Sequence, residues 1–320
     1  MQQGWRRRLG DRIIRAPRQQ ALEPLRIITP PAPTLGRRLE SPLILLYGFG
    51  SLIAIGTLLL WLPIFNTTGR FAPFLTALFT ATSASTNTGL TVVDTATYWN
   101  RAGQTVIMVL MQIGGLGFMS TATFLLVILT QRISLANQFI MRDFLGVGHL
   151  SGLARLTLQV VAVALVVQVA GFMVFYWRFL PLFGLREAAW QAGFLAISAF
   201  NNAGFSILPD SNSLGRFGGE MWVLGTAGAL IILGGISYSV LVDLVRYRRF
   251  KRFTLDSRLV IVASLSLWVL GGLVIFVSEF ANGATLKGLP FTDKLAASLF
   301  HSVSARTAGL STIDFSLTQQ

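Results

Sequence analysis

The sequence contains no cysteine and very little charge. Without cysteine the chain has no disulfide, no thiolate metal site and no cysteine nucleophile. Charged residues make up 12% of its 320 residues, whereas a soluble domain carries about 25%. Hydrophobic residues make up 53%, and the mean hydropathy is +0.63. Most of the chain therefore does not face water, and the composition predicts an integral membrane protein.

Side chains suited to catalysis are also scarce. His149 and His301 are the two histidines, and they lie far apart in the sequence. The sequence shows no paired carboxylates, no histidine-containing metal set and no nucleophile beside a base, which are the groups that an enzyme needs. We therefore predict a protein that is not an enzyme and has no covalently bound cofactor.

The net charge of +13 comes from arginines and lysines that lie at the ends of apolar segments. Nucleic-acid-binding surfaces instead gather basic residues on one face, so we expect no nucleic acid partner. Residues 1–40 contain nine arginines and no apolar core of a signal peptide, and Pro30, Pro31 and Pro33 would interrupt a helix. We predict that residues 1–41 form a basic cytoplasmic tail.

Five stretches are long and apolar enough to cross a bilayer, which takes about 20 helical residues. Glycines interrupt several of them, including the pairs Gly114-Gly115 and Gly234-Gly235. Small residues let the helices of a membrane bundle approach closely, so we expect these glycines to mark close packing. The five predicted spans are residues 42–62, 105–129, 156–179, 222–245 and 259–280.

The positions of lysine and arginine predict the orientation of the chain. Eighteen of them lie in the tail and in the connections 132–155 and 246–258, and seven lie in connections on the opposite side. Because positively charged connections stay in the cytoplasm, the larger group marks the cytoplasmic side. We predict a multi-pass protein of the plasma membrane whose N-terminus is cytoplasmic.

Three shorter apolar stretches, residues 72–84, 188–200 and 291–304, lie on the outer side. At about 13 residues each, they are too short to span and fit re-entrant segments. Each runs into a similar loop, centred on Gly89, Gly204 or Gly309, with an apolar residue next and Thr or Ser after that. The glycines are 115 and 105 residues apart, which indicates an internal repeat.

One repeat comprises a spanning helix, a short pore helix, a loop that returns outward and a second spanning helix. The predicted fold is an all-α polytopic membrane protein of such channel-like units, at residues 42–131, 155–247 and 257–320. Two units are complete, whereas the third stops after its loop and a fourth is absent. Because a loop without its second span lacks support, we expect the sequence to be a fragment or a truncated form.

The repeated loops predict the function. Non-helical backbone at membrane depth is costly unless it is buried in protein or lines water, so three such loops suggest convergence on one axis. Their carbonyls could replace the hydration shell of a permeating cation, and glycine tolerates the angles this needs. The short helices would aim their partially negative C-terminal ends at the ion. We expect Thr91, Ser206 and Ser311 to hydrogen-bond the loops to their surroundings.

This order of elements, with Thr86-Asn87-Thr88-Gly89-Leu90-Thr91 and Ala305-Arg306-Thr307-Ala308-Gly309-Leu310-Ser311, resembles the Trk/Ktr/HKT superfamily. Its members are potassium and sodium transporters with four such units in one chain. The chain is most similar to the bacterial Ktr membrane subunit, because Trk-type subunits carry an extra pair of spans before the first unit. The resemblance covers nearly everything after the basic tail.

The resemblance implies potassium uptake across the cell inner membrane, with K⁺ as the transported ion and Na⁺ as a candidate activator. It also implies a homodimer in the lipid bilayer, gated by a cytosolic nucleotide-binding regulatory ring. In plant relatives a Ser at the first filter glycine is associated with sodium transport, so Gly89 favours potassium. The residues that would bind K⁺ through backbone carbonyls are Asn87, Thr88, Gly89, Asn202, Ala203, Gly204, Thr307, Ala308 and Gly309.

Two other functions stay open. The first is a sodium or mixed sodium and potassium transporter of the same superfamily. The second is an alternating-access secondary transporter, although that class often places ionisable groups within its spans, and the predicted spans are almost free of them. A non-conducting scaffold would leave three matched loops unexplained.

Charged residues near the loops allow more than one role. We expect Arg306 to be buried behind the third loop, because a cation on the path would repel the ion; a pore-facing Arg306 is the alternative. Asp94, Asp210 and Asp314 follow the three loops and would either concentrate cations or be ordinary solvated residues. We expect His301 to be packed on the third short helix.

Overall fold

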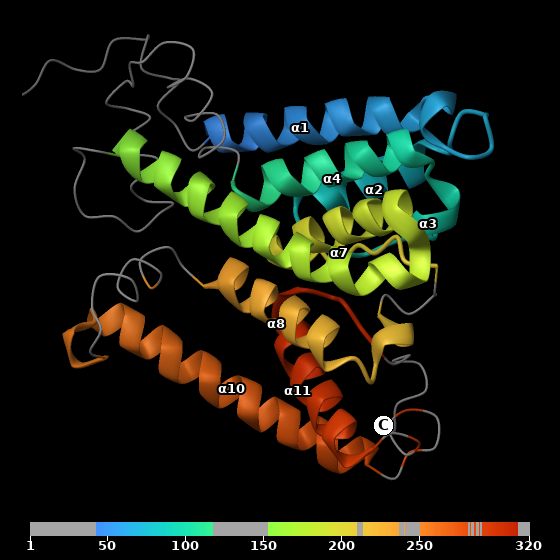
Figure 1. The fold of residues 1–320 in the computed structure, drawn as a ribbon. Coiled ribbons are helices and arrows are strands. Elements are labelled where there is room, and N and C mark those ends of the chain that lie inside the picture. The colour runs from blue at the N-terminus through green and yellow to red at the C-terminus, as the bar shows by residue number, and fades with distance from the viewer. Residues whose placement is uncertain are drawn as a thin grey trace, which may run out of the picture. The chain divides into compact units, whose positions relative to one another are not determined.

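The structure is a computed structural model. It describes residues 43–117, 153–209, 214–236, 250–280 and 290–312, with the single residues 240, 282, 285 and 288. All of them belong to one compact unit, Leu39–Gln320. The described residues form helices and connecting loops (Figure 1), and they contain no strand beyond an isolated bridge between Asn66 and Trp99.

In the first predicted unit a short helix lies between two longer ones. α2 contacts both α1 and α4, which also contact each other. Pro73 precedes α2, and the side chain of Asn100 caps α4 by accepting a hydrogen bond from the Gly103 N–H at 3.0 Å. The elements are α1 (Leu43–Trp61), the 3-10 turn η3 (Pro63–Phe65), α2 (Phe74–Ser85), α3 (Thr95–Tyr98) and α4 (Arg101–Gly115).

The second predicted unit begins with α7 (Leu153–Phe200), which contains one break. Pro181 lies inside it, and Gly184 has φ 74° and ψ 171°, which is not helical. Proline weakens a helix by removing a donor, and glycine adopts positive φ without steric cost. α7 is therefore a long helix followed by a short one. The turn η4 (Gly215–Phe217) and α8 (Met221–Gly235) follow, and α8 packs against α7.

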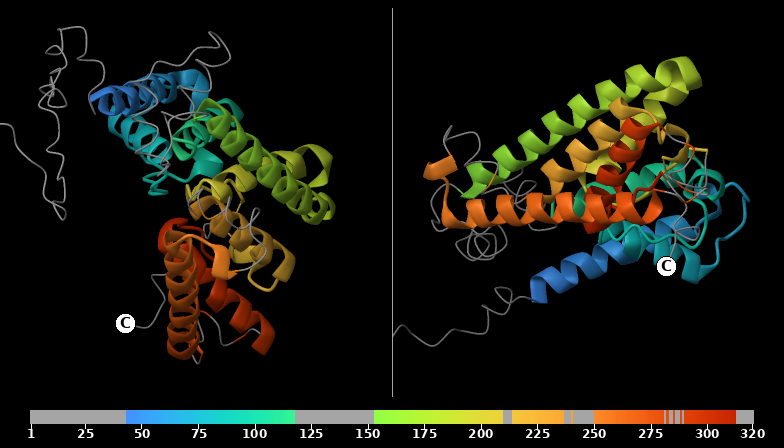
Figure 2. Two further views of the ribbon diagram at one scale, coloured as in Figure 1. Left: turned by 90° about the vertical axis from the view of Figure 1, so that its left-hand side faces the viewer. Right: turned by 90° about the horizontal axis from the view of Figure 1, so that it is seen from below.

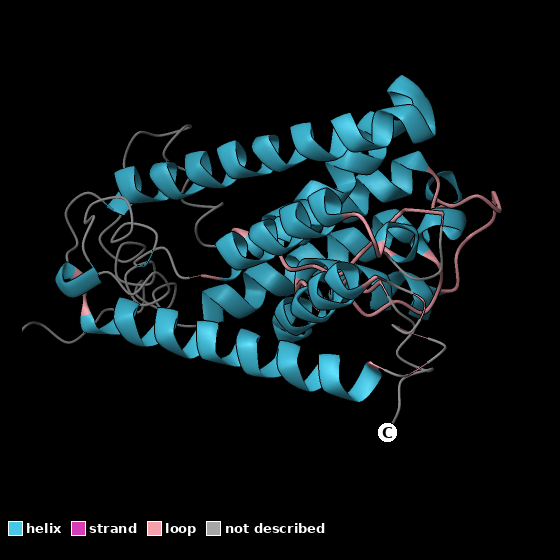
Figure 3. Cartoon of the chain, turned by 60° about the horizontal axis from the view of Figure 1, so that its bottom comes forward, coloured by secondary structure: helices cyan, strands magenta, loops and turns pink. Residues whose placement is uncertain are grey.

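The third predicted unit contributes the turn η5 (Phe250–Arg252), α10 (Leu255–Glu279) and α11 (Phe291–Thr307). α11 packs against α10 of its own unit and against α8 of the second, and α4 of the first unit packs against α7. The helices of the three units are thus neighbours in chain order (Figure 2). Helices dominate the described residues, and loops connect them (Figure 3).

The short apolar stretches are helices that end close to the predicted positions: α2 at Ser85, α7 at Phe200 and α11 at Thr307. Two of the predicted spans, 105–129 and 222–245, are wrong as continuous helices. α4 ends at Gly115 and α8 at Gly235, since Gly117 has φ 75° and Ile236 is extended. Apolar composition predicts burial in lipid but not helical continuity, and glycine is a poor helix former.

Among the described residues, two helices are long and apolar enough to cross a membrane, Gln159–Phe200 and Ser257–Glu279. Leucine and valine side chains are exposed along α10, including Leu259, Val262 and Leu273. An apolar surface of this extent fits lipid better than water. The fold is that of an all-α membrane protein, as the composition predicts.

The buried apolar side chains form two clusters that enclose the short helices. The first joins Ala77 and Ala81 of α2 to Trp99 and Met111. The second joins the end of α7 to α8 and α11, and includes Phe175, Phe179, Ala199, Leu224 and Phe300. The C-terminal halves of α2 and of the short helix that ends at Phe200 are therefore packed against protein.

Several predictions fall outside the described residues. These are the basic tail 1–41, nearly all of the connection 132–155, and residues 246–249 of the connection 246–258. The boundaries of the units 42–131, 155–247 and 257–320 and the cytoplasmic N-terminus stay predictions.

Candidate functional site

Gly89, Gly204 and Gly309 meet one another in the structure. A Cβ added to Gly89 would lie 2.8 Å from the carbonyl oxygen of Ala203 and 2.9 Å from the Cα of Gly204. A Cβ on Gly204 would lie 2.8 Å from the carbonyl oxygen of Ala308 and 3.6 Å from the Cα of Gly309. The three loops thus pack backbone to backbone, and a side chain at Gly89 or Gly204 would collide with a neighbouring loop.

The same glycines need a conformation that other residues rarely adopt. Their φ angles are 78° at Gly89, 73° at Gly204 and 67° at Gly309. A Cβ makes this region costly for L-residues, by about 1–2 kcal/mol. The backbone angle therefore favours glycine at all three positions, and close approach also requires it at Gly89 and Gly204.

The first two loops leave their short helices through a left-handed asparagine. Asn87 has φ 52° and Asn202 has φ 54°. The N–H of Thr88 donates to the Ser83 carbonyl and the N–H of Ala203 to the Ser198 carbonyl, each at 2.9 Å. These bonds form a Schellman ending, in which asparagine is an accepted left-handed residue. The ending reverses the chain so that the following glycine faces the other loops.

The side chains of these asparagines also tie each loop to the helix that follows. In the orientation that satisfies its neighbours, the Asn87 amide donates to the carbonyls of Ala84 and Met111 and accepts from the Gly115 N–H. The Asn202 amide nitrogen lies 3.4 Å from the Ile231 carbonyl oxygen on α8. The sequence predicts that the backbone carbonyls of both asparagines bind the ion. Their side chains also act as clamps, which means that they hold the loop against the helix that follows it.

Glycine pairs let the following helices approach the ends of the short helices. A Cβ on Gly114 would lie 2.1 Å from the Ser85 carbonyl oxygen, and one on Gly234 would lie 1.6 Å from the Phe200 carbonyl oxygen. Ser85 and Phe200 are the last residues of α2 and α7, respectively. The close packing predicted for these glycines is confirmed, and Gly114 and Gly234 pack against the ends of the short helices.

The third loop is built differently. α11 continues to Thr307, and Ala308 keeps a right-handed helical conformation before Gly309. The N–H of Gly309 donates to the Ser304 carbonyl at 3.3 Å. Position 307 holds threonine where the other loops have their asparagines, so this loop lacks the asparagine clamp.

Serines on two of the short helices hold the carbonyl that follows the glycine. The Ser198 hydroxyl donates to the Phe205 carbonyl at 2.6 Å, and the Ser304 hydroxyl donates to the Leu310 carbonyl. Sequence reasoning missed this role for both serines. The signal was available, since a serine lies five or six positions before the glycine in each loop.

A second group of missed residues joins the first unit to the second loop. The Gln112 side-chain oxygen on α4 accepts from the Asn201 amide at 2.9 Å and from the Gln168 amide at 3.0 Å. Near the N-terminal end of α4, the Trp190 indole N–H donates to the Gln104 side-chain oxygen at 2.7 Å. Polar residues within an apolar helix were the available signal, because they need a partner when buried.

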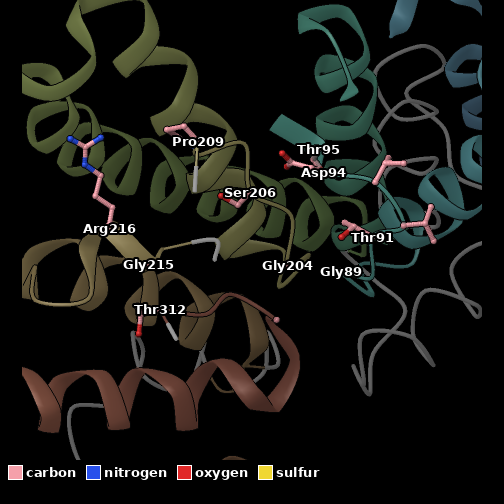
Figure 4. Close-up of a pocket in the computed structure, with 13 residues that line it drawn as sticks. Gly89, Thr91, Asp94, Thr95, Gly204, Ser206, Pro209, Gly215, Arg216 and Thr312 are labelled. Carbon is pink, nitrogen blue, oxygen red and sulfur yellow. The ribbon is translucent and has the colours of Figure 1, made fainter. Parts of the chain in front are cut away.

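A cavity of about 1290 Å³ opens directly over the three glycines (Figure 4). Thr91, Asp94, Ser206, Arg216 and Thr312 are among the residues that line it, and they come from all three predicted units. In Figure 4 the Arg216 side chain points away from Gly89 and Gly204, and its guanidinium lies 5.8 Å from the centre of the Phe183 ring. The cavity has room for hydrated ions above the loops.

Asp94 is exposed and lines this cavity, as a cation-attracting residue would. Its carboxylate also caps α3 by accepting from the Ala96 N–H at 3.0 Å. Asp210 and Asp314 lie outside the described residues. Of the hydroxyls expected to hold the loops, that of Ser206 accepts a hydrogen bond from the Leu208 N–H at 3.2 Å. Ser311 instead uses its carbonyl, which accepts from the Leu214 N–H at 2.8 Å.

Two further expectations have clear outcomes. Arg306 is exposed rather than buried, and its guanidinium donates to the Ser264 hydroxyl on α10 at 2.8 Å. The long side chain reaches past its own helix, so the expected burial is wrong although the contact with α10 fits a position behind the loop. His301 is fully buried on α11, as predicted.

The arrangement can bind a cation through oxygen atoms. Backbone carbonyls near the three glycines offer hard oxygen atoms, the kind of group that can replace water around an alkali cation. The short helices end beside these loops, and the C-terminal end of a helix carries a partial negative charge. Neither feature needs a catalytic side chain or a bound cofactor.

Comparison with known proteins identifies the family. The family described as TrkH, cation transport protein, matches residues 42–320 of this sequence. The chain belongs to the TrkH family. The resemblance to the Trk/Ktr/HKT superfamily is therefore confirmed, and the family is one of transporters rather than of enzymes.

Two curated relatives within this group are similar over most of the chain. The potassium/sodium uptake protein NtpJ of Enterococcus hirae is 38% identical over 279 residues, which cover 87% of this chain and 61% of that protein. The Ktr system potassium uptake protein B of Bacillus subtilis is 40% identical over 278 residues, which cover 87% and 62%. The chain thus spans less than two thirds of the length of these relatives.

A solved structure supports the same fold. The crystal structure of the potassium transporter TrkH from Vibrio parahaemolyticus matches with a TM-score of 0.60 at 18% sequence identity. The match covers 86% of this chain and 52% of that one. At this identity the likeness concerns the fold alone, and it confirms a helical membrane architecture of the TrkH type.

Proposed function

We propose that the chain forms most of the conducting part of a potassium uptake protein. The observation that carries this proposal is the meeting of Gly89, Gly204 and Gly309 below one cavity, with their loops packed backbone to backbone. Side chains are excluded from this point, so carbonyl oxygens are the groups available to a passing ion. Conduction would be passive, with K⁺ shedding its water as it enters the loops.

The ion-binding residues in this proposal are the predicted ones. Carbonyls of Thr88, Ala203 and Ala308 directly precede the glycines, and those of Asn87, Asn202 and Thr307 lie one residue earlier. The oxygens of Ala203 and Ala308 already face the neighbouring glycines. K⁺ would be held by several such oxygens at once and by no covalent cofactor.

Sodium is the second candidate ion. The printed name of the Enterococcus hirae relative includes both potassium and sodium, so Na⁺ would be either a second transported ion or an activator. The glycine at position 89 favours potassium, as it does in the related transporters. A comparison of uptake rates for the two ions decides between them.

The partners follow from the same relatives. The name of the Bacillus subtilis relative describes one lettered component of a potassium uptake system, which supports a separate partner subunit. We expect a homodimer in the cell inner membrane, regulated by a cytosolic nucleotide-binding ring. The arginine-rich connections 132–155 and 246–258 would face that ring from the cytoplasmic side.

Growth at low potassium tests the proposal. The full-length gene, co-expressed with its cytosolic partner, should rescue a bacterium that lacks its own potassium uptake systems. Gly204→Ala should abolish the rescue, because its Cβ would collide with the Ala308 carbonyl at φ 73°. Gly225→Ala is the matched control, since a Cβ there meets nothing within 4 Å.

Rescue by the unaltered protein and by Gly225→Ala, but not by Gly204→Ala at equal membrane levels, would support potassium uptake through these loops. Failure of the unaltered protein to rescue, with both subunits present in the membrane fraction, would contradict it. Normal growth of Gly204→Ala would contradict the role of the loops.

A further inference from the structure

One pair of positions sets the third loop apart from the other two. Eight residues before the loop glycine, the first two units have Ala81 and Ala196, whereas the third has His301. Three residues after the glycine, the first two units have Val92 and Ile207, whereas the third has Thr312. An apolar combination in two units is therefore replaced by a polar pair in the third.

The two polar side chains meet. The Nε2 atom of His301 lies 2.8 Å from the Thr312 hydroxyl oxygen, and it also accepts from the Thr312 backbone N–H at 3.4 Å. His301 is 0% exposed and Thr312 is 8% exposed. A hydrogen bond away from water is not weakened by solvent competition, so the contact fixes both the side chain and the backbone of Thr312.

We call residues 310–312, which follow Gly309, the outer limb of the third loop. Thr312 lies in this limb and lines the cavity over the glycines. The preceding residue, Ser311, is tied to the second unit through the Leu214 N–H. The limb is therefore fixed from two sides, by His301 of its own pore helix and by the loop of the neighbouring unit. Gly309 lies three residues from this anchor.

The third loop depends on such an anchor more than the others do. It has no counterpart of Asn87 or Asn202, whose amides bind the helix after the loop. Without a tie on the outer limb, the carbonyls around Gly309 would have more freedom than those of the other loops.

We propose that His301 is a positioning residue that holds the outer limb of the third loop through Thr312, and that this bond sets cation selectivity at the outer mouth. The inference rests on the proposed cation uptake. Discrimination between K⁺ and Na⁺ depends on the number and placement of carbonyl oxygens around the ion. A loosened outer limb lets the carbonyl oxygens close around Na⁺, the smaller ion. The selectivity for K⁺ over Na⁺ then falls while conduction continues.

The test is the ratio of K⁺ to Na⁺ uptake by the intact gene product with its regulatory partner, in vesicles or in cells. Thr312→Val keeps the side-chain shape and removes the hydroxyl, and His301→Ala removes the ring. We expect either change to lower the ratio about fivefold, the effect of one buried hydrogen bond. The double variant should be no worse than either single variant, because both remove the same bond.

Matched variants separate positioning from packing. Thr312→Ser keeps the hydroxyl and His301→Gln keeps a polar group near Nε2, so both should retain most of the selectivity. Ser298→Ala removes a hydroxyl from the same buried helix, one that donates to the Lys294 carbonyl rather than to the loop. It should leave the ratio unchanged.

An unchanged K⁺ to Na⁺ ratio in Thr312→Val, at normal membrane levels, would overturn the inference. A lower protein level with an unchanged ratio in His301→Ala would also overturn it, because His301 would then only stabilise the fold. If the unaltered protein takes up no cation, the proposed function fails instead. Unaltered uptake with insensitive variants leaves that function standing and removes only the role of His301.

Discussion

Asn87 and Asn202 each combine two properties that other residues supply separately. Glycine adopts their positive φ but offers no side chain, and other polar residues offer hydrogen bonds but resist the conformation. Asparagine does both, so one residue ends the pore helix and clamps the loop to α4 or α8. The sequence shows both asparagines, but their backbone angle and clamping role depend on contacts with helices that follow about 25 residues later.

Substitution at Asn202 separates the two properties. Asn202→Ala should lower the stability of the protein by about 2–3 kcal/mol, from the left-handed backbone and the lost hydrogen bonds. Asn202→Gly restores the backbone freedom and should lose only about 1 kcal/mol. Thermal unfolding of the purified protein in detergent measures both changes. Equal stability of the alanine and glycine variants would contradict the strained backbone at this position.

At the scale of elements, the ends of α2 and α7 are packed against glycine pairs on the helices that follow them. The Gly114-Gly115 and Gly234-Gly235 pairs lie at the ends of α4 and α8, where each helix touches the last carbonyl of a short helix. The approach brings a whole turn of the supporting helix against the loop. Such packing transmits the position of α4 or α8 to the loop glycine four residues beyond the short helix.

The neighbouring glycines of α8 give a matched comparison. Gly234→Ala should greatly reduce uptake, because its Cβ would lie 1.6 Å from the Phe200 carbonyl oxygen. Gly235→Ala should be tolerated, because its Cβ would meet the Asn202 side chain at 3.5 Å. Initial rates of rubidium uptake at equal membrane levels compare the two. Similar rates in both variants would show that close packing on the short helix is not required.

The sequence predicts that the helices exist better than it predicts where the longer ones end. The repeated glycine loops were enough to predict where the short helices end. α2, α7 and α11 end within three residues of the predicted positions. The same composition predicted the spans 105–129 and 222–245, but within them the chain leaves the helix near Gly117 and Ile236. Apolar residues are equally suited to a helix in lipid and to a break that is buried in protein, so composition cannot distinguish them.

At the scale of the molecule, three units of similar order bring their loops to one place. The repeat predicts three equivalent loops, and the structure brings their glycines together beneath a shared cavity. The contacts between units are less regular than the repeat. Gln104 and Gln112 tie the first unit to the second, whereas His301 and Thr312 anchor the third. The glutamine pairings join residues 86 and 89 positions apart, so the sequence marks the glutamines but not their partners.

The most direct test is whether one cation path passes the three loops. The 320 residues contain no cysteine, so single cysteines can be placed at Thr91, Ser206 and Thr312, one from each loop, which all line the cavity. A positively charged thiol reagent added outside should block K⁺ uptake at each of the three, and external K⁺ should slow the block. Arg70→Cys, at an exposed residue outside the cavity lining, is the control. Labelling of all three cysteines without any loss of uptake would contradict a shared path.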